Sequence, residues 1–335
     1  MRPPKVLIVR FSSIGDIVLT TPVIRCVREQ TGAEVHFLTK EAFAATLRHH
    51  PLLTRLWTIR KDVKEIAAEL IEAGFTHVVD LHGNLRSWEV KQRLRWGHLR
   101  RGGRPPRCTT FPKLNLQKFL LTRFQLDRLP DVHIVDRYLS AAAPLGVSND
   151  GRGLDYHTGD PAVDVPDGPF VAFVIGAAHA TKCLEAQQME RICRNLPYPV
   201  LLIGGPAERE LGQHLAASGR NTVNTCGRYT LNESAEVIRR ASVVLTHDTG
   251  MMHVAAAFGK RIVSVWGNTV PALGMYPYLP GGPTAYVAEV MGLDCRPCSK
   301  IGYAECPKGH FRCMREQDTA AIERAVLLAV EAEFL

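Results

Sequence analysis

Short apolar runs rich in β-branched residues alternate with longer helical patterns along most of this chain, and this alternation constrains its fold more than any other feature. The first half has strands predicted at residues 5–10, 34–38, 55–59 and 77–80 and helices at 17–30, 41–49 and 63–73. Consecutive parallel strands need a crossover connection, which is usually a helix. The pattern therefore predicts an α/β domain with a doubly wound parallel sheet.

A stretch rich in Gly, Pro and Asp at residues 143–169 interrupts the alternation and is typical of a linker. The second half has strands predicted at residues 170–175, 200–203, 243–246 and 262–266 and helices at 185–194, 207–217, 233–240 and 251–258. We predict two Rossmann-like domains, 1–155 and 156–315, followed by a C-terminal helix at 316–335. Two such domains would face a cleft at the carboxyl ends of their strands, where ligands of open α/β sheets bind.

Length and composition agree with this architecture. With 335 residues, 46% of them hydrophobic, the chain can bury two ordinary cores. Its longest apolar runs have the length of a strand, far short of the roughly 20 residues that span a bilayer. The N-terminal residues lack the apolar core and cleavage site of a signal peptide, so we expect a cytoplasmic protein.

The loop Arg10-Phe11-Ser12-Ser13-Ile14-Gly15-Asp16 follows the first predicted strand and opens a helix. Asp16 could simply cap that helix, since an acidic residue is favourable in a first turn. Ser12 and Ser13 are also available as caps, which would leave Asp16 free. A carboxylate at this edge of a sheet could then act as a general base toward an attacking hydroxyl group.

A second helix start carries polar residues in the segment Asp248-Thr249-Gly250-Met251-Met252-His253. Thr249 and Gly250 leave the first N–H groups of the helix accessible, and such groups favour a diphosphate. Asp248 and His253 could face the same ligand, although an N-cap and a structural histidine are the simpler alternatives. Lys182 and Glu208 follow two neighbouring predicted strands, where they could meet phosphate and ribose, or could be ordinary surface residues.

Taken in order, these motifs resemble the bacterial heptosyltransferases of glycosyltransferase family 9. The matching segments are 12–16, 80–87, His133 with 136–138, 180–182 and 248–256. The resemblance implies a GT-B fold, an acceptor site in the first domain and ADP-heptose in the second. It also implies inverting transfer of L-glycero-D-manno-heptose to the lipopolysaccharide inner core, on a lipid A–Kdo or already heptosylated acceptor. No cofactor is required by that scheme.

The same resemblance implies roles for individual residues. Asp16 would be the base, and Lys182 would neutralise the leaving diphosphate. Donor binding would involve Thr181, Lys182, Glu208, Asp248, Thr249, Gly250 and His253, and acceptor binding Ser12, Ser13, Gly15, Arg86, His133 and Arg137. The family usually continues the lysine motif with Arg-Trp-Pro, whereas this chain has Cys183-Leu184-Glu185. A family 9 transferase with a different sugar or acceptor is therefore the alternative.

The net charge of +8 is concentrated in residues 86–128, which alone carry +10. Aromatic residues are interspersed there, which would suit an anionic lipid-anchored acceptor and peripheral contact with the cytoplasmic face of the inner membrane. A solvated helical face is the simpler interpretation. Such a segment would also suit RNA, but no RNA-binding module is present, so we do not expect a nucleic acid partner.

Four of the nine cysteines lie within nineteen residues, at Cys295, Cys298, Cys306 and Cys313, with His310 between them. Their number suffices for a tetrahedral structural zinc ion. Their spacing is not that of a standard zinc knuckle, so reduced thiols or a disulfide are the alternatives. We place this cluster outside the active site.

Overall fold

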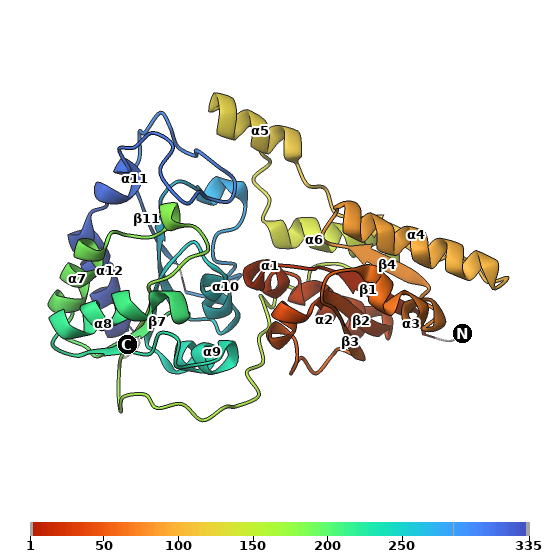
Figure 1. Ribbon diagram of the computed structural model, residues 1–335, viewed down its shortest axis with the longest axis horizontal. Coiled ribbons are helices and arrows are strands. Elements are labelled where there is room, and N and C mark those ends of the chain that lie inside the picture. Colours follow the sequence, from red (N-terminus) through yellow and green to blue (C-terminus); the bar gives the residue numbers. More distant parts are fainter. Residues whose placement is uncertain (1–2, 284, 333–335) are drawn as a thin grey trace. The chain divides into compact units, whose positions relative to one another are not determined.

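The computed structural model describes residues 3–283 and 285–332 and divides into two compact units (Figure 1). Unit 1 comprises Met1–Lys113 and Val132–His157, and unit 2 comprises Leu114–Asp131 and Thr158–Leu335. The chain thus leaves unit 1 two residues beyond the domain boundary predicted at 155. Residues 114–131, expected in the first domain, cluster with unit 2.

Unit 1 is built on a five-stranded parallel sheet in the order β3-β2-β1-β4-β5. Its strands are β1 (Lys5–Val9), β2 (Glu34–Lys40), β3 (Arg55–Ile59), β4 (His77–Asp80) and β5 (Arg107–Thr110). Its helices are α1 (Ile14–Val18), α2 (Thr21–Thr31), α3 (Ala67–Glu72), α4 (Leu85–Arg100) and α6 (Ile134–Ala142), with 3-10 turns η1 (Glu41–Thr46), η2 (Val63–Ile66) and η3 (Ala143–Leu145).

Helices cover both faces of this sheet. Successive side chains of a strand point to opposite faces, so the apolar residues of its central strands need cover on each side. Leu7 and Val9 of β1 join a buried cluster with Leu70 of α3 and Leu94 of α4. Helices α2 and α6 contact each other. Helix α2 also contacts strand β2, and helix α6 contacts strand β4. The unit is therefore doubly wound, as the alternation of patterns predicted.

Unit 2 has a six-stranded parallel sheet in the order β11-β10-β9-β6-β7-β8. Its strands are β6 (Val171–Val174), β7 (Val200–Ile203), β8 (Thr222–Asn224), β9 (Val243–His247), β10 (Arg261–Trp266) and β11 (Tyr286–Glu289). Its helices are α5 (Asn115–Phe124), α7 (Ala186–Asn195), α8 (Arg209–Ser218), α9 (Leu231–Arg240), α10 (Gly250–Ala257), α11 (Arg312–Arg315) and α12 (Thr319–Glu331), with 3-10 turns η4 (Ala180–Lys182), η5 (Pro206–Glu208) and η6 (Pro271–Leu273).

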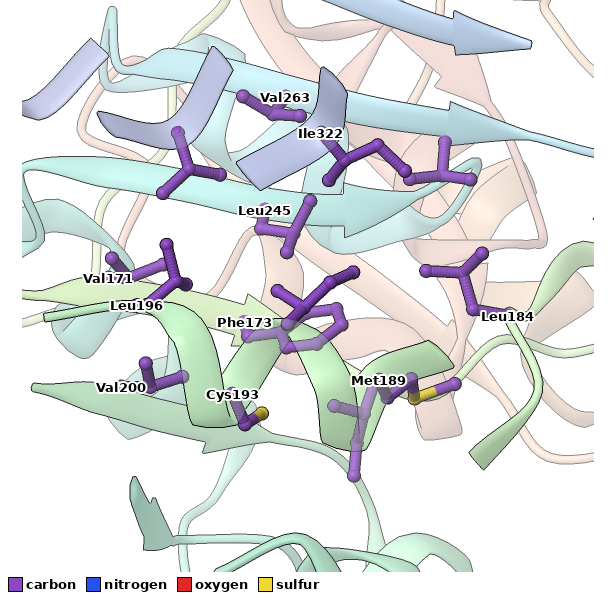
Figure 2. Close-up of a cluster of buried hydrophobic side chains, with 14 of the residues drawn as sticks. Val171, Phe173, Leu184, Met189, Cys193, Leu196, Val200, Leu245, Val263 and Ile322 are labelled. Atoms are coloured by element: carbon purple, nitrogen blue, oxygen red, sulfur yellow. The ribbon is translucent and has the colours of Figure 1, made fainter. Parts of the chain in front are cut away.

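One face of the second sheet packs against α7 and α12. Figure 2 shows Phe173 of β6 at the centre of this core, with Met189 and Cys193 of α7 beside it. Ile322 of α12 belongs to the same buried cluster. Helices α9 and α10 contact each other, and α10 contacts β9 and β10. Each unit thus has its own core and its own doubly wound sheet, which confirms the predicted fold class.

Several local predictions were wrong in detail. The helix predicted over 17–30 is two helices, because Pro22 fits the first turn of α2 but cannot continue a helix begun at α1. The C-terminal helix begins at Thr319, and residues 333–335 of the predicted range lie outside the described part of the chain. A search of the described residues finds no helix with the length and apolarity of a membrane span.

Candidate active site

The candidate residues follow strands that flank the switch point of each sheet. In unit 1 the chain runs outward from β1 through β2 to β3 and then returns to β4, so that β1 and β4 are neighbours. In unit 2 it runs from β6 through β7 to β8 and then returns to β9 beside β6. Crevices at the carboxyl ends of such strand pairs are the usual binding sites of open α/β sheets. Asp16 follows β1, and the pair Lys182 and Asp248 follows β6 and β9.

Asp16 lies in the first turn of α1 with both carboxylate oxygens engaged. Its Oδ1 pairs with Nη2 of Arg10 at 2.6 Å, and its Oδ2 accepts hydrogen bonds from the N–H and the hydroxyl of Ser13 at 3.1 and 2.9 Å. Arg10 also donates to the carbonyl groups of Leu81 and Ser12, at 2.6 and 2.8 Å. Ser13 is the N-cap of α1, as expected, but Asp16 is not left free, since its carboxylate accepts the Ser13 N–H and pairs with Arg10.

These contacts decide the charge of Asp16. Burial raises the pKa of the Asp16 carboxyl, but the charge of Arg10 and the hydrogen bonds from Ser13 outweigh burial, so that the pKa is lowered. The ring of Tyr138 lies 5.7 Å from the Arg10 guanidinium, and burial raises the pKa of Tyr138. The site in unit 1 therefore holds an ionised carboxylate with 21% of its side chain exposed, able to receive a proton.

The side chain of Phe11, in the loop that carries Asp16, contacts the segment that follows β4. The His82 ring meets it edge-on at 5.3 Å between centroids, and the Arg86 guanidinium lies 5.6 Å from its centroid. Burial, with the charges of Arg10 and Lys113, lowers the pKa of His82 to about 4, so this imidazole is neutral near pH 7. Sequence reasoning did not single out His82, although it lies inside the matched segment 80–87.

Asp80 organises the turn that carries His82 and Arg86. One of its oxygens accepts the N–H groups of His82 and Gly83 at 3.0 and 2.7 Å. The other binds the Ser87 hydroxyl at 2.9 Å and the Lys91 ammonium at 2.8 Å. Burial opposes ionisation, but Lys91 and these donors lower the pKa of Asp80. A charged, buried carboxylate thus fixes the start of α4.

Other predicted acceptor residues are held mainly by the fold of unit 1. His133 is the N-cap of α6, and its Nδ1 accepts the N–H of Val135 at 3.2 Å. Arg137 is buried and donates to the carbonyls of Pro112 and Lys113. Gly15 is buried within α1, and the Ser12–Ser13 peptide bond is cis. The acceptor roles predicted for these residues stay predictions.

Lys182 and Asp248 meet across the switch point of unit 2. Lys182 Nζ lies 2.6 Å from Asp248 Oδ2, and the Thr269 hydroxyl donates to the same oxygen at 2.8 Å. Both charged side chains are largely buried, so the pair is shielded from bulk water more than a surface pair. Sequence reasoning did not connect Thr269 with this pair, because Thr269 follows β10 and only the tertiary structure places β10 beside β9.

Two further contacts fix the loop that carries Lys182. The buried His247 accepts the Leu184 N–H through Nε2 at 3.1 Å, and burial lowers the pKa of His247 to about 4. The Thr181 hydroxyl donates to the Tyr303 carbonyl and accepts the Tyr303 N–H, at 3.0 and 2.8 Å. Thr181 therefore positions the loop, whatever contact it makes with a ligand.

The start of α10 completes this group. Thr249 is its N-cap and Gly250 its first residue, and the Thr249 hydroxyl lies 3.4 Å from that of Thr246. His253 is buried one turn further on. The helix end thus presents backbone N–H groups beside the Lys182–Asp248 pair, which is a favourable environment for phosphate.

Glu208 lies over the carboxyl ends of β6 and β7. Its Oε2 accepts the N–H of Gly205 at 2.8 Å. A Cβ at Gly176 would come within 2.6 Å of the Glu208 carboxyl carbon, so this side chain crosses the end of β6 closely. The carboxylate is half-buried and remains within reach of the crevice between these strands.

The cysteine cluster lies in unit 2 as a network of thiols. Cys298 Sγ donates to the Cys295 carbonyl at 2.8 Å, and His310 Nε2 lies 3.7 Å from Cys295 Sγ. Burial and the neighbouring thiols raise the pKa of Cys298 to about 12. Over residues 3–283 and 285–332, no three His, Cys, Asp or Glu side chains are grouped as a metal site. The zinc site stays a prediction.

Comparison with known proteins identifies relatives along nearly the whole chain. Residues 63–305 match the model of glycosyltransferase family 9 (heptosyltransferase). Lipopolysaccharide heptosyltransferase 1 of Pseudomonas aeruginosa is 28% identical over 325 residues, covering 88% of this chain and 86% of the relative.

Solved structures share the fold. A glycosyltransferase family 9 protein from Veillonella parvula aligns with a TM-score of 0.76 at 20% identity, over 98% of both chains. Escherichia coli heptosyltransferase WaaC with ADP-2-deoxy-2-fluoro heptose aligns with a TM-score of 0.65 at 19% identity, over 98% of this chain and 99% of the other.

Proposed function

We propose, from the premise that this chain belongs to glycosyltransferase family 9, that it transfers L-glycero-D-manno-heptose from ADP-heptose to the inner core of lipopolysaccharide. One observation carries the proposal. Each switch point holds one half of the required chemistry: an ionised Asp16 in unit 1, and Lys182 beside a helix N-terminus in unit 2. The E. coli relative solved with an ADP-heptose analogue supports the choice of donor.

The proposed reaction is a single displacement with inversion. The acceptor hydroxyl attacks C1 of the heptose and forms the new glycosidic bond, and its proton passes to Asp16. The bond between C1 and the β-phosphate oxygen breaks, and its electron pair leaves with ADP. Lys182 and the N–H groups at Thr249–Gly250 stabilise the charge that grows on the diphosphate. Asp248 holds Lys182 in place before the donor arrives.

Acceptor binding belongs to unit 1 in this proposal. Ser12, Ser13 and Gly15 surround Asp16, and Arg86 offers a cation to an anionic core sugar from the start of α4. Glu208 would accept hydrogen bonds from the ribose of the donor in unit 2. The acceptor is lipid-anchored, so the enzyme would work at the cytoplasmic face of the inner membrane, and the positive charge of residues 86–128 supports that location.

A family 9 transferase with another sugar is the second candidate. It is favoured by Cys183-Leu184-Glu185, where the family usually has Arg-Trp-Pro, and by the bond that fixes Leu184 to His247. Incubation with ADP-heptose, UDP sugars and GDP sugars, each with a Kdo-containing lipid A acceptor, separates the two. With ADP-heptose we expect release of ADP and a heptosylated product. Because the reaction inverts the anomeric carbon, a β-linked donor should give an α-linked product. Turnover only with UDP or GDP sugars would refute the proposed donor.

A further inference from the structure

Helix α4 is apolar on two opposite sides, and its inward side is fully used by the fold. Val90 and Leu94 are buried in the core of unit 1. Gly97 approaches α3 so closely that a Cβ there would lie 2.5 Å from Cδ1 of Ile71. The inward face of α4 is therefore packed tightly against its own unit.

The outward side of α4 carries four large apolar residues. Leu85, Trp88, Trp96 and Leu99 are 86%, 56%, 59% and 45% exposed. At about 100° per residue their spacing places them within an arc of about 80°, in a stripe about 20 Å long. We call these four residues the outer stripe. Single exposed apolar residues are common, but an aligned row with two tryptophans on a helix already packed on its other side marks a binding surface.

The residues beside the outer stripe are predominantly cationic. Arg95 and Arg100 flank it and are exposed. Glu89, the only acidic residue of the helix, is neutralised by Arg93 at 2.7 Å. Tryptophan favours the boundary between lipid tails and headgroups, and arginine is attracted to anionic lipids. The chemistry of this face thus matches an anionic bilayer surface.

We propose that α4 is an interfacial helix, which lies along an anionic phospholipid bilayer with the outer stripe in the headgroup region. This inference rests on the proposed function, since a lipid-anchored acceptor has to be reached at a membrane. The first turn of α4 also carries Arg86, beside Phe11 and the Asp16 loop. An α4 that lies on the bilayer keeps the acceptor residues of unit 1 close to the surface from which the core sugars project.

Vesicle flotation tests the proposal with the full-length protein. Vesicles of phosphatidylethanolamine and phosphatidylglycerol should bind it, and vesicles of phosphatidylcholine alone should bind it much more weakly. The double variant Trp96→Gln/Leu99→Gln should lower the partition coefficient at least about tenfold. Arg95→Gln should lower it about fivefold and reduce its dependence on salt. Leu328→Gln, which changes an exposed leucine on α12 of unit 2, is the control and should bind like the unchanged protein.

Tryptophan fluorescence reports on the same surface. The chain has four tryptophans, of which Trp57 and Trp266 are buried and only Trp88 and Trp96 are exposed. Brominated lipids should therefore quench the emission of the unchanged protein, and the Trp96→Gln/Leu99→Gln variant should lose most of that quenching. Equal vesicle binding by this variant and the unchanged protein would overturn the proposal.

Two more outcomes would also overturn it. One is a dimer that these substitutions dissociate, in a protein that does not bind vesicles, because the stripe would then bind a second copy. The other is a loss of transfer to a deacylated, water-soluble acceptor that is as large as the loss with the lipid-anchored acceptor. The residues would then serve the reaction itself. Failure of the proposed function is distinguishable, since it would abolish heptosyl transfer and leave vesicle binding intact.

Discussion

The proposed mechanism gives Asp16 two tasks that the sequence presents as alternatives. Its carboxylate receives the Ser13 N–H at the start of α1, and it also pairs with Arg10. The pairing keeps the carboxylate ionised in a partly buried place, and an ionised group is what a general base requires. Capping and catalysis are therefore compatible in one residue here, because the carboxylate has two oxygens and part of it remains exposed.

Asp16→Asn tests the base. The amide keeps the shape of the side chain and can still accept the Ser13 N–H, but it cannot take a proton from the acceptor. We expect the kcat for heptosyl transfer to fall about a hundredfold or more, with the affinity for ADP unchanged. Steady-state kinetics and ADP titration measure these two quantities. Asp62→Asn, which alters the exposed N-cap of η2, should leave both unchanged. Full activity of Asp16→Asn would show that another group is the base.

If Asp16 is the base, Arg10 sets the pH range in which it acts. Because the folded pKa of Asp16 is lowered, the carboxylate persists as the pH falls through the ordinary range near about 3.9. In Arg10→Gln, burial is no longer outweighed by the positive charge, so we expect the acid limb of the kcat/KM profile to move to higher pH. Arg10→Lys should restore part of the difference. An acid limb in the same place for all three proteins would contradict this role, and melting curves would identify variants that fail to fold.

At the scale of elements, the segment predicted as a linker is partly fixed to unit 1. Arg25 of α2 is buried and donates to Asp150 at 2.7 and 2.8 Å and to the Gly153 carbonyl at 2.8 Å. It also pairs with Asp155. Arg25 lowers the pKa of Asp150, which shows that the charged pair is the favoured state. One arginine thus holds both ends of the 150–155 turn against α2.

Arg25→Met should lower the free energy of unfolding by about 3 kcal/mol, because two carboxylates lose their buried partner. Urea denaturation at pH 7 measures this change. Arg48→Met removes an exposed arginine from the same unit and should change the free energy of unfolding by no more than about 0.5 kcal/mol. Similar stability of Arg25→Met and Arg48→Met would mean that the 150–155 turn contributes little to folding.

At the scale of the molecule, the proposed mechanism divides the chemistry between two units with separate cores. A ligand that binds only the folded state stabilises the unit that holds it. We therefore expect ADP at about a hundred times its Kd to add about 2.7 kcal/mol to stability. Hydrogen exchange should slow mainly in unit 2, at residues 176–182 and 247–250.

Lys182→Ala is the matching variant for the ADP experiment. It should weaken ADP binding and reduce this protection, whereas Lys308→Ala, an exposed lysine of the same unit, should not. Slowed exchange confined to unit 1 would place the donor there and would refute the assignment of the donor site to unit 2. UDP and GDP at the same concentration should stabilise the protein less than ADP.

The sequence by itself determined the fold class of both halves and the polar residues at the ends of their strands. β3, β4 and β7 were predicted to the residue, because short runs with apolar residues bounded by turns are a local signal. Strands β5, β8 and β11 were missed. They are short edge strands in which all residues but Ala288 are exposed or half-buried, so their sequences lack the apolar pattern of a central strand.

Only the tertiary structure decided which of those strand ends are neighbours. The order of strands places Asp248 beside Lys182 and adds Thr269 to that pair. It also showed that the outer stripe of α4 faces away from a completed core. Hydrophobic periodicity reports whether a residue is buried within its own element, whereas contacts between residues far apart in the chain depend on strand order, which no local pattern contains.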